Sequence, residues 1–323
     1  MRHSPFILLL LLGALGAVPA QVDSADLPDE TSVNADSDAP ASVAPPDAGL
    51  PAPRLLLVPP EISLPGELTD KYVVNEKDKR YIPPRLSELP ANAWGEQVRY
   101  GRRLFVDTQR YAKHLVGNGL NCSNCHLGEG RALGAAPLWA GYPLYPLYRG
   151  KNLRANTYAE RIGECFRYSM AGLAPTIDSP EMKALVAYSQ WLSTSVPTRT
   201  IMAARGIPGA NAPREASPEH GRVVYDSQCA VCHGKQGEGV RRADGVGYQF
   251  PPLWGNDSYA AGAGMNKLGT GAGFIKANMP LGKGGSLSAQ DAMDVSFYLM
   301  IQDRPWDPRM GWFSILMGRI ADG

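Results

Sequence analysis

The chain has 323 residues, 44% of them hydrophobic, and its 32 Lys and Arg nearly balance its 31 Asp and Glu. The balance is uneven, because residues 1–53 hold one basic and seven acidic side chains, a net charge of −6, which leaves +7 on residues 54–323. This length and composition exclude a disulfide-stapled miniprotein, a collagen-like repeat and a wholly disordered chain.

The first twenty residues have the pattern of a secretory signal peptide. A basic start precedes an apolar run over residues 6–18, which leads into the small residues Val-Pro-Ala. We predict cleavage after residues 1–20 and export to the periplasm, an oxidising compartment; the alternative is an uncleaved anchor. Residues 21–60 are a predicted disordered linker rich in Ala, Pro and Asp, since such a segment buries too little apolar surface to offset its ordering entropy.

The rest of the chain has no apolar run of the roughly 18 residues needed to span a bilayer. The mature chain is therefore expected to have no membrane span. Its excess positive charge is modest and accompanies no nucleic-acid-binding motif, so no nucleic-acid partner is expected.

Four of the five cysteines stand in two copies of the pattern Cys-x-x-Cys-His. The pattern attaches a c-type haem, because two cysteines one helical turn apart reach both vinyl groups while the adjacent His ligates the iron. A thioredoxin-like redox pair or half a zinc site does not explain a His after both pairs. We predict two covalently bound haem c groups, attached and proximally ligated by Cys122, Cys125 and His126, and by Cys229, Cys232 and His233.

An internal duplication supports this interpretation. Cys229 follows Cys122 by 107 residues, and the same offset aligns Trp191 with Tyr298, each followed by Leu. Each haem motif is thus followed by an equivalent aromatic-Leu pair, which predicts two copies of one haem-binding unit.

The predicted elements of each unit are a helix before the haem motif and an amphipathic helix after it. The first are marked by residues 101–105 and 221–225, and the second by residues 179–193 and 286–302, with Ser caps at their starts. The expected fold is mainly α, with two domains that resemble class I cytochrome c, residues 61–205 and 206–323. Residues 195–217, which carry several Pro and Gly, are expected to link the two domains.

A class I cytochrome c takes its sixth iron ligand, commonly Met, from a loop between the haem motif and the last helix. Met279 lies 50 residues beyond Cys229 in a Met-Pro-Leu-Gly stretch typical of such loops. We expect it to ligate the second haem, where a thioether raises the reduction potential. Met265, Met293 and Lys276 are weaker alternatives.

The distal ligand of the first haem has two candidates. Met170, 48 residues after Cys122, matches the spacing better than Cys165, at 43. Cys165 is nevertheless the only cysteine not committed to a haem, although a buried inert thiol is the usual interpretation of such a residue. Residues 149–167 carry a net charge of +3, which favours a thiolate and attracts anions unless it forms a solvated basic face; the charged residues are Arg149, Lys151, Arg154, Arg161 and Arg167 against Glu160 and Glu164.

Residues 160–172 read ERIGECFRYSMAG and resemble the distal-ligand segment of thiosulfate dehydrogenases, dihaem c-type cytochromes that couple thiosulfate to tetrathionate. The resemblance runs from about residue 92 to residue 305, and this string makes it specific. It implies that the distal ligands are Cys165 for the first, catalytic haem and Met279 for the second, electron-transfer haem. It also implies that Arg161 and Ser169 line the substrate site, with Cys165 as the third catalytic residue.

The same string departs from the family's usual pattern at two positions. An Arg commonly precedes the Ser and an Asn follows the Met, where this chain has Tyr168 and Ala171. The departure bears on substrate affinity and reaction direction more than on iron ligation.

The implied activity is the joining of two thiosulfates, with electrons passing through the second haem to a small c-type cytochrome or similar acceptor. Two electrons leave the substrates, and each haem takes one. At 4 Å in water the repulsion between two dianions is about four times the ~1 kcal/mol of unit charges, and arginines offset it. A Cys165 thiolate that leaves the iron would bond transiently to a substrate sulfur, as a further hypothesis.

Three other functions fit parts of the pattern. One is the Cys-ligated haem subunit of a Sox system, which transfers sulfur to a carrier protein and needs a partner subunit. Another is a dihaem electron carrier without a substrate, in which Met170 is the ligand and Cys165 is buried. The third is the same fold run in reverse as a tetrathionate reductase.

Overall fold

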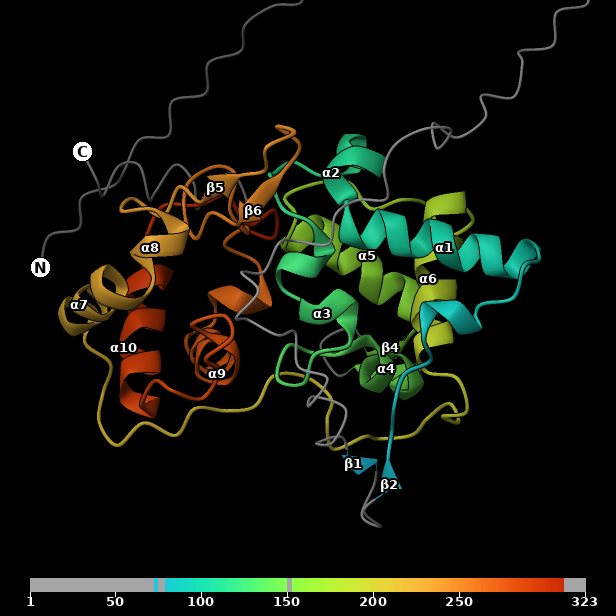
Figure 1. Cartoon of the computed structure of the whole chain (residues 1–323), viewed down its shortest axis with the longest axis horizontal. Helices are drawn as coiled ribbons and strands as arrows, with labels where there is room; N and C mark the ends of the chain where they lie inside the picture. The colour runs from blue at the N-terminus through green and yellow to red at the C-terminus, as the bar shows by residue number, and fades with distance from the viewer. Residues whose placement is uncertain (1–72, 75–78, 150–152, 311–323) are drawn as a thin grey trace, which may run out of the picture. The chain divides into compact units, whose positions relative to one another are not determined.

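The computed structural model describes residues 73–74, 79–149 and 153–310, all within the compact unit Arg54–Gly323 (Figure 1). The predicted signal peptide, residues 1–20, and the predicted linker, residues 21–60, lie outside the described residues. The described part is mainly helical, as predicted, and none of its helices is long and apolar enough to cross a membrane.

Helices make up most of the regular structure. The α-helices are α1 (Ala93–Val106), α2 (Thr108–Tyr111), α3 (Leu127–Gly130), α4 (Leu138–Gly141), α5 (Tyr158–Tyr168), α6 (Pro180–Leu192), α7 (Pro218–Gln228), α8 (Ala230–His233), α9 (Leu268–Asn278) and α10 (Ala289–Met300). Short strands pair antiparallel in sequence order: β1 (Val73–Val74) with β2 (Lys79–Arg80), β3 (Leu147–Arg149) with β4 (Arg154–Asn156), and β5 (Val240–Arg241) with β6 (Tyr248–Phe250).

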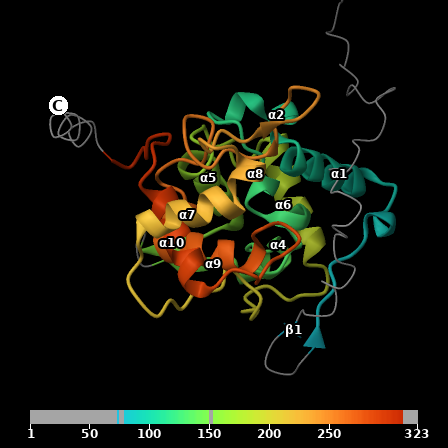
Figure 2. The ribbon, with the colours of Figure 1, turned by 60° about the vertical axis from the view of Figure 1, so that its left-hand side comes forward.

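Two helix pairs cross at glycines. A Cβ atom on Gly101 of α1 would lie 2.0 Å from the carbonyl oxygen of Ala184 in α6. A Cβ atom on Gly221 of α7 would lie 2.1 Å from that of Asp294 in α10. Only glycine permits such close backbone contact, so both crossings use the same device. Figure 2 shows α7 lying across α10.

The crossings correct the alignment of the two units. Next to each glycine stands a tyrosine, Tyr188 in α6 and Tyr298 in α10, and each ring packs against an aromatic of the partner helix, at centroid distances of 5.6 and 5.7 Å. Tyr188 is therefore the counterpart of Tyr298, and the expected match of Trp191 with Tyr298 is wrong by three residues. The aromatic-Leu pairs coincide in spacing from the cysteines, but the helix crossing determines which residues are equivalent.

The helix starts agree with the sequence. Ser179 Oγ accepts a hydrogen bond from the backbone N–H of Met182 at the start of α6, and Ser288 Oγ accepts one from Asp291 at the start of α10. The described residues 193–217 between α6 and α7 form no helix or strand, in keeping with the predicted link.

Separate apolar clusters fill the space beside each pair. The larger lies around α1, α5 and α6 and includes Trp139, Phe166 and Tyr188; the second lies around α7, α9 and α10 and includes Tyr225 and Val295. A third, small cluster joins residues that follow the first haem motif to α9, through Ala132, Ala135 and Phe274. This third cluster brings the surroundings of the two motifs together.

Candidate active site

The first haem motif presents its histidine in a form suited to iron. The His126 Nδ1 atom lies 2.8 Å from the carbonyl oxygen of Ala136. A proton on Nδ1 that is donated to this carbonyl leaves Nε2 free as a ligand. Burial raises the pKa of Cys122 to about 11 and that of Cys125 to about 12, so both thiols stay protonated near neutral pH.

The second motif repeats this arrangement. His233 Nδ1 lies 2.7 Å from the carbonyl oxygen of Pro251, and burial lowers the pKa of the imidazole despite this contact, which favours the neutral ligand form. Burial also raises the pKa of Cys229 to about 11. Two thiols beside an imidazole with one nitrogen available fit a covalently attached haem at both places.

Cys165 faces the first motif from α5. Thr157 caps the start of this helix: its Oγ1 accepts a hydrogen bond from the Glu160 N–H, while the Glu160 carboxylate accepts one from the Thr157 N–H. Burial alone would raise the pKa of Cys165, but the charge of Arg161 and a hydrogen-bond contact with the His126 ring outweigh it and lower the pKa to about 7. The thiolate is therefore substantially populated at neutral pH.

Met170, the alternative ligand, is buried. Its side chain is 6% exposed and packs in the larger apolar cluster. The structure brings Cys165 to the histidine of the first motif, whereas the contacts described for Met170 are with this cluster. This placement supports Cys165 as the residue opposite His126.

Arg161 and Ser169 share the face of α5 that carries Cys165, because residues four apart follow one another along a helix face. Arg161 Nη1 lies 3.4 Å from the carboxylate of Glu164, and the negative charge of the Cys165 thiolate raises the pKa of Arg161. Ser169 ends the helix, where its N–H donates to the carbonyl oxygen of Cys165. All three predicted catalytic residues are therefore neighbours.

The chain is similar to known proteins over most of its length. The thiosulfate dehydrogenase of Stutzerimonas stutzeri is 50% identical over 246 residues, which cover 76% of this chain and 80% of that one. The chain belongs to the thiosulfate dehydrogenase family. The thiosulfate dehydrogenase of Thiomonas intermedia is 45% identical over 232 residues, 71% of this chain and 73% of its own.

Two further comparisons agree with this family. A solved structure, thiosulfate dehydrogenase TsdBA from Marichromatium purpuratum in its "as isolated" form, matches with a TM-score of 0.68 and 43% identity. The match covers 72% of this chain and 51% of that one, so the chain spans about half of the solved protein's length. Residues 216–299 match the family model described as cytochrome c oxidase, cbb3-type, subunit III. This thiosulfate dehydrogenase family member is therefore an oxidoreductase with c-type haem.

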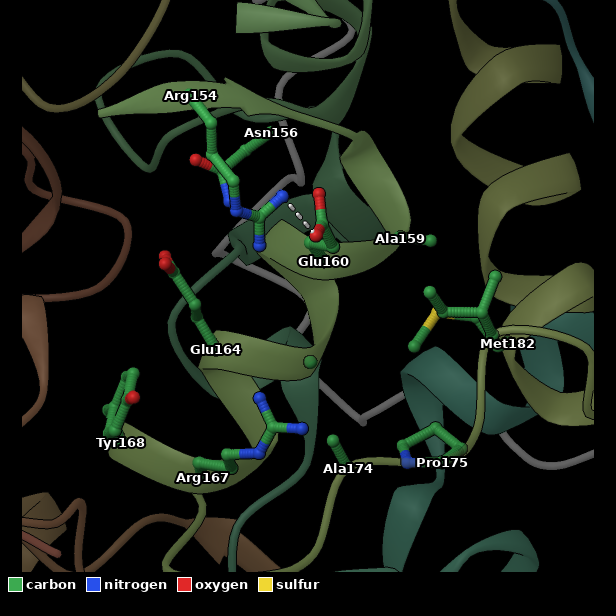
Figure 3. A pocket seen from close by; sticks show the side chains of 12 residues that line it. Arg154, Asn156, Ala159, Glu160, Glu164, Arg167, Tyr168, Ala174, Pro175 and Met182 are labelled. Carbon is green, nitrogen blue, oxygen red and sulfur yellow. Dashed lines mark ion pairs between the residues drawn. The ribbon is translucent and has the colours of Figure 1, made fainter. Parts of the chain in front are cut away.

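The sequence predicted that the basic residues near Cys165 surround it, but in the structure not all of them do. Arg154 forms an ion pair of 2.6 Å with Glu160, and Arg154 and Arg167 line a cavity of about 560 Å³ beside α5 (Figure 3). Among the described arginines, Arg161 is the one with a large effect on Cys165, and its charge lowers the Cys165 pKa. The prediction fails for Arg167 because a helix turns residues 161 and 167 to different faces. It fails for Arg154 because this residue lies in β4, where its guanidinium is paired with Glu160. The side chain of Arg149 and the whole of Lys151 lie outside the described residues.

The predicted distal ligand of the second haem follows α9. Met279 packs against the apolar cluster around α7, α9 and α10, as Cys229 and Trp254 do. Lys276, the alternative ligand, donates hydrogen bonds to the carbonyl oxygens of Gly285, at 2.7 Å, and Leu287. Because its ammonium group is held by these carbonyls, the structure favours Met279.

Two asparagines form contacts that the sequence did not predict. Asn118 bonds to Ser169 and Ser258, and Asn278 bonds to Gly134. These partners are 51 to 144 residues away along the chain, so no local motif or periodicity reveals them.

Proposed function

We propose that the chain oxidises two thiosulfate ions to tetrathionate at a first haem attached by Cys122 and Cys125 and ligated by His126 and Cys165. The observation that carries this proposal is the contact between the Cys165 thiol and the His126 ring, beside Arg161. Family membership supplies the substrate class. A low-pKa thiol beside an arginine suits a site that receives an anionic sulfur substrate.

The chain's own residues prepare the site for anions. Two thiosulfates carry four negative charges in total, and tetrathionate carries two, so two electrons must leave as the sulfur–sulfur bond forms. When bound, the two haems accept these electrons one at a time. Arg161 offsets the substrate charge, and its half-buried position strengthens that effect relative to open water.

The second haem is held in this proposal by Cys229, Cys232 and His233, with Met279 as its distal ligand. A haem held there would supply one-electron chemistry between the first site and an external acceptor, a small c-type cytochrome or a similar carrier. Residues 61–205 and 206–323 are the corresponding haem domains. Export by residues 1–20 would place the enzyme in the periplasm.

A direct assay tests the proposed function. Purified, haem-loaded protein is mixed with thiosulfate and ferricyanide, and tetrathionate is measured. We expect one tetrathionate for every two ferricyanide ions reduced. No product from protein with an intact haem spectrum would refute the proposal.

A further inference from the structure

Three distant segments cross behind the helix that carries Cys165. Residues 115–119 run between residues 169–173, where α5 ends, and residues 257–260, which precede α9. Backbone hydrogen bonds join them on both sides: Gly117 N–H to Met170 O and Leu173 N–H to Leu115 O on one, and Gly119 N–H to Asp257 O on the other, all 2.9–3.1 Å.

Asn118 is at the centre of the crossing and is fully buried, with 0% exposure. Its Nδ2 atom donates to the carbonyl oxygens of Ser169, at 3.0 Å, and Ser258, at 2.9 Å. Its Oδ1 atom accepts from the N–H of Leu120 at 3.3 Å. Both amide hydrogens and the amide oxygen are therefore used, which no other side chain of this size can reproduce.

The crossing leaves no room for the end of α5 to move. A Cβ atom on Gly117 would lie 2.1 Å from the carbonyl oxygen of Ala171, and one on Gly172 would lie 2.1 Å from that of Leu115. The two backbones are thus in direct contact. A shift of Ser169 would break its bond to Asn118.

The loop before α9 forms a second hydrogen bond with Ser169. The Ala260 N–H donates to the carbonyl oxygen of Ser169 at 3.1 Å. The preceding residue, Tyr168, packs against Arg309, whose guanidinium carbon lies 4.5 Å from the centroid of the Tyr168 ring. Arg309 Nη2 also donates a hydrogen bond to the carbonyl oxygen of Gly262. Both contacts are made by residues of the predicted second haem domain, residues 206–323.

We propose that Asn118 is a positioning residue for the first haem site: it fixes the Ser169 end of α5, and through this helix Cys165 and Arg161, against residues 257–260. The inference rests on the proposed function, since it assigns the substrate site to this helix. It means that the first haem site is completed by a segment of the second unit. Neither unit alone would hold Cys165 and Ser169 in the described arrangement.

The test compares the holoprotein with Asn118→Asp, which keeps the size but points a carboxylate oxygen at two carbonyl oxygens, and with Asn118→Ser, which keeps one donor. Electron paramagnetic resonance separates the thiolate-ligated haem from the other haem, and steady-state kinetics give kcat and KM for thiosulfate. We expect Asn118→Asp to shift or broaden only the thiolate signal and to raise KM about 10-fold or more. Asn118→Ser should give a smaller change of the same kind.

Asn266→Asp is the matched control, because Asn266 Nδ2 donates to Ala261 O in the neighbouring loop without a described bond to α5. It should leave the thiolate signal and KM unchanged. A folded Asn118→Ser protein with the parent's signal and KM would overturn the inference, as would equal effects on both haem signals or an equal effect of the control. If the parent shows a thiolate signal but makes no tetrathionate, the proposed function fails while the spectroscopic comparison still decides the role of Asn118. A parent without a thiolate signal would overturn both.

Discussion

The side chain of Asn278 donates a 3.0 Å hydrogen bond to the carbonyl oxygen of Gly134. This bond ties the end of α9, next to Met279, to the loop that follows the first haem motif. Two residues along the same loop, the carbonyl of Ala136 faces Nδ1 of His126. A short path therefore connects the proximal residue of the first haem site to the distal residue proposed for the second.

The close contact around Gly134 predicts how much stability an added methyl group would cost. Gly134 has φ +74°, and a Cβ atom on it would lie 2.7 Å from Cβ of Ala277, whereas Gly245 has the same φ and nothing within 4 Å. Gly245→Ala should lower the free energy of unfolding by about 1 kcal/mol through backbone strain. Gly134→Ala should cost about 1–3 kcal/mol more, because it also overpacks the contact. Denaturant unfolding of both holoproteins measures the difference, and equal losses would contradict the described contact.

Local features of the fold could be predicted from the sequence, while contacts between distant segments could not. The Ser caps at residues 179 and 288 and the haem motifs depend on neighbours within a few residues, and the structure places the caps where expected. The equivalence of Tyr188 and Tyr298 depends on where the two helices of each unit cross, which the cysteine spacing does not determine. In the same way, the charge around Cys165 depends on helix faces, so counting basic residues overstated it.

The buried carboxylate of Asp294 predicts a loss of stability in acid. Its side chain is 0% exposed and accepts hydrogen bonds from Arg214 and from the N–H of Ser217, and it contacts His220 Nδ1 at 2.9 Å. Burial alone would raise the Asp294 pKa, but these bonds and one from Gln290 outweigh it and lower the pKa. The unfolded chain then binds the proton more readily.

Stability from Asp294 is therefore present above the ordinary aspartate pKa of about 4 and is lost as pH falls through the lower folded value. Asp294→Asn should cost about 3 kcal/mol at neutral pH and should flatten the acid branch of the stability curve. Denaturant unfolding between neutral pH and about pH 3 measures both effects. Asp226→Asn, which alters a long, exposed ion pair with Arg222, should change little; an unchanged acid branch in Asp294→Asn would refute the assignment.

The two faces of α5 predict different roles for two arginines. Arg161 acts on the Cys165 thiol, whereas Arg167 lines the cavity beside this helix. Arg161→Gln should raise KM for thiosulfate about 10-fold or more, since a charge-assisted contact to the substrate is lost. Arg167→Gln, with the same loss of charge, should leave KM within about twofold, because a screened charge that is farther from the substrate contributes little. Equal increases in KM from the two substitutions would contradict this, because they would show that the overall positive charge near the site, rather than a contact of Arg161 with the substrate, determines binding.

The most direct test of the account is tetrathionate formation by Cys165→Met and Met170→Leu, each with both haems attached. We expect Met170→Leu, a change of similar volume in the apolar cluster, to keep the parent rate within a few-fold. We expect Cys165→Met to lose at least about 100-fold in rate. A Cys165→Met protein that forms tetrathionate at the parent rate, with activity lost instead in Met170→Leu, would contradict the assignment of the active site to Cys165.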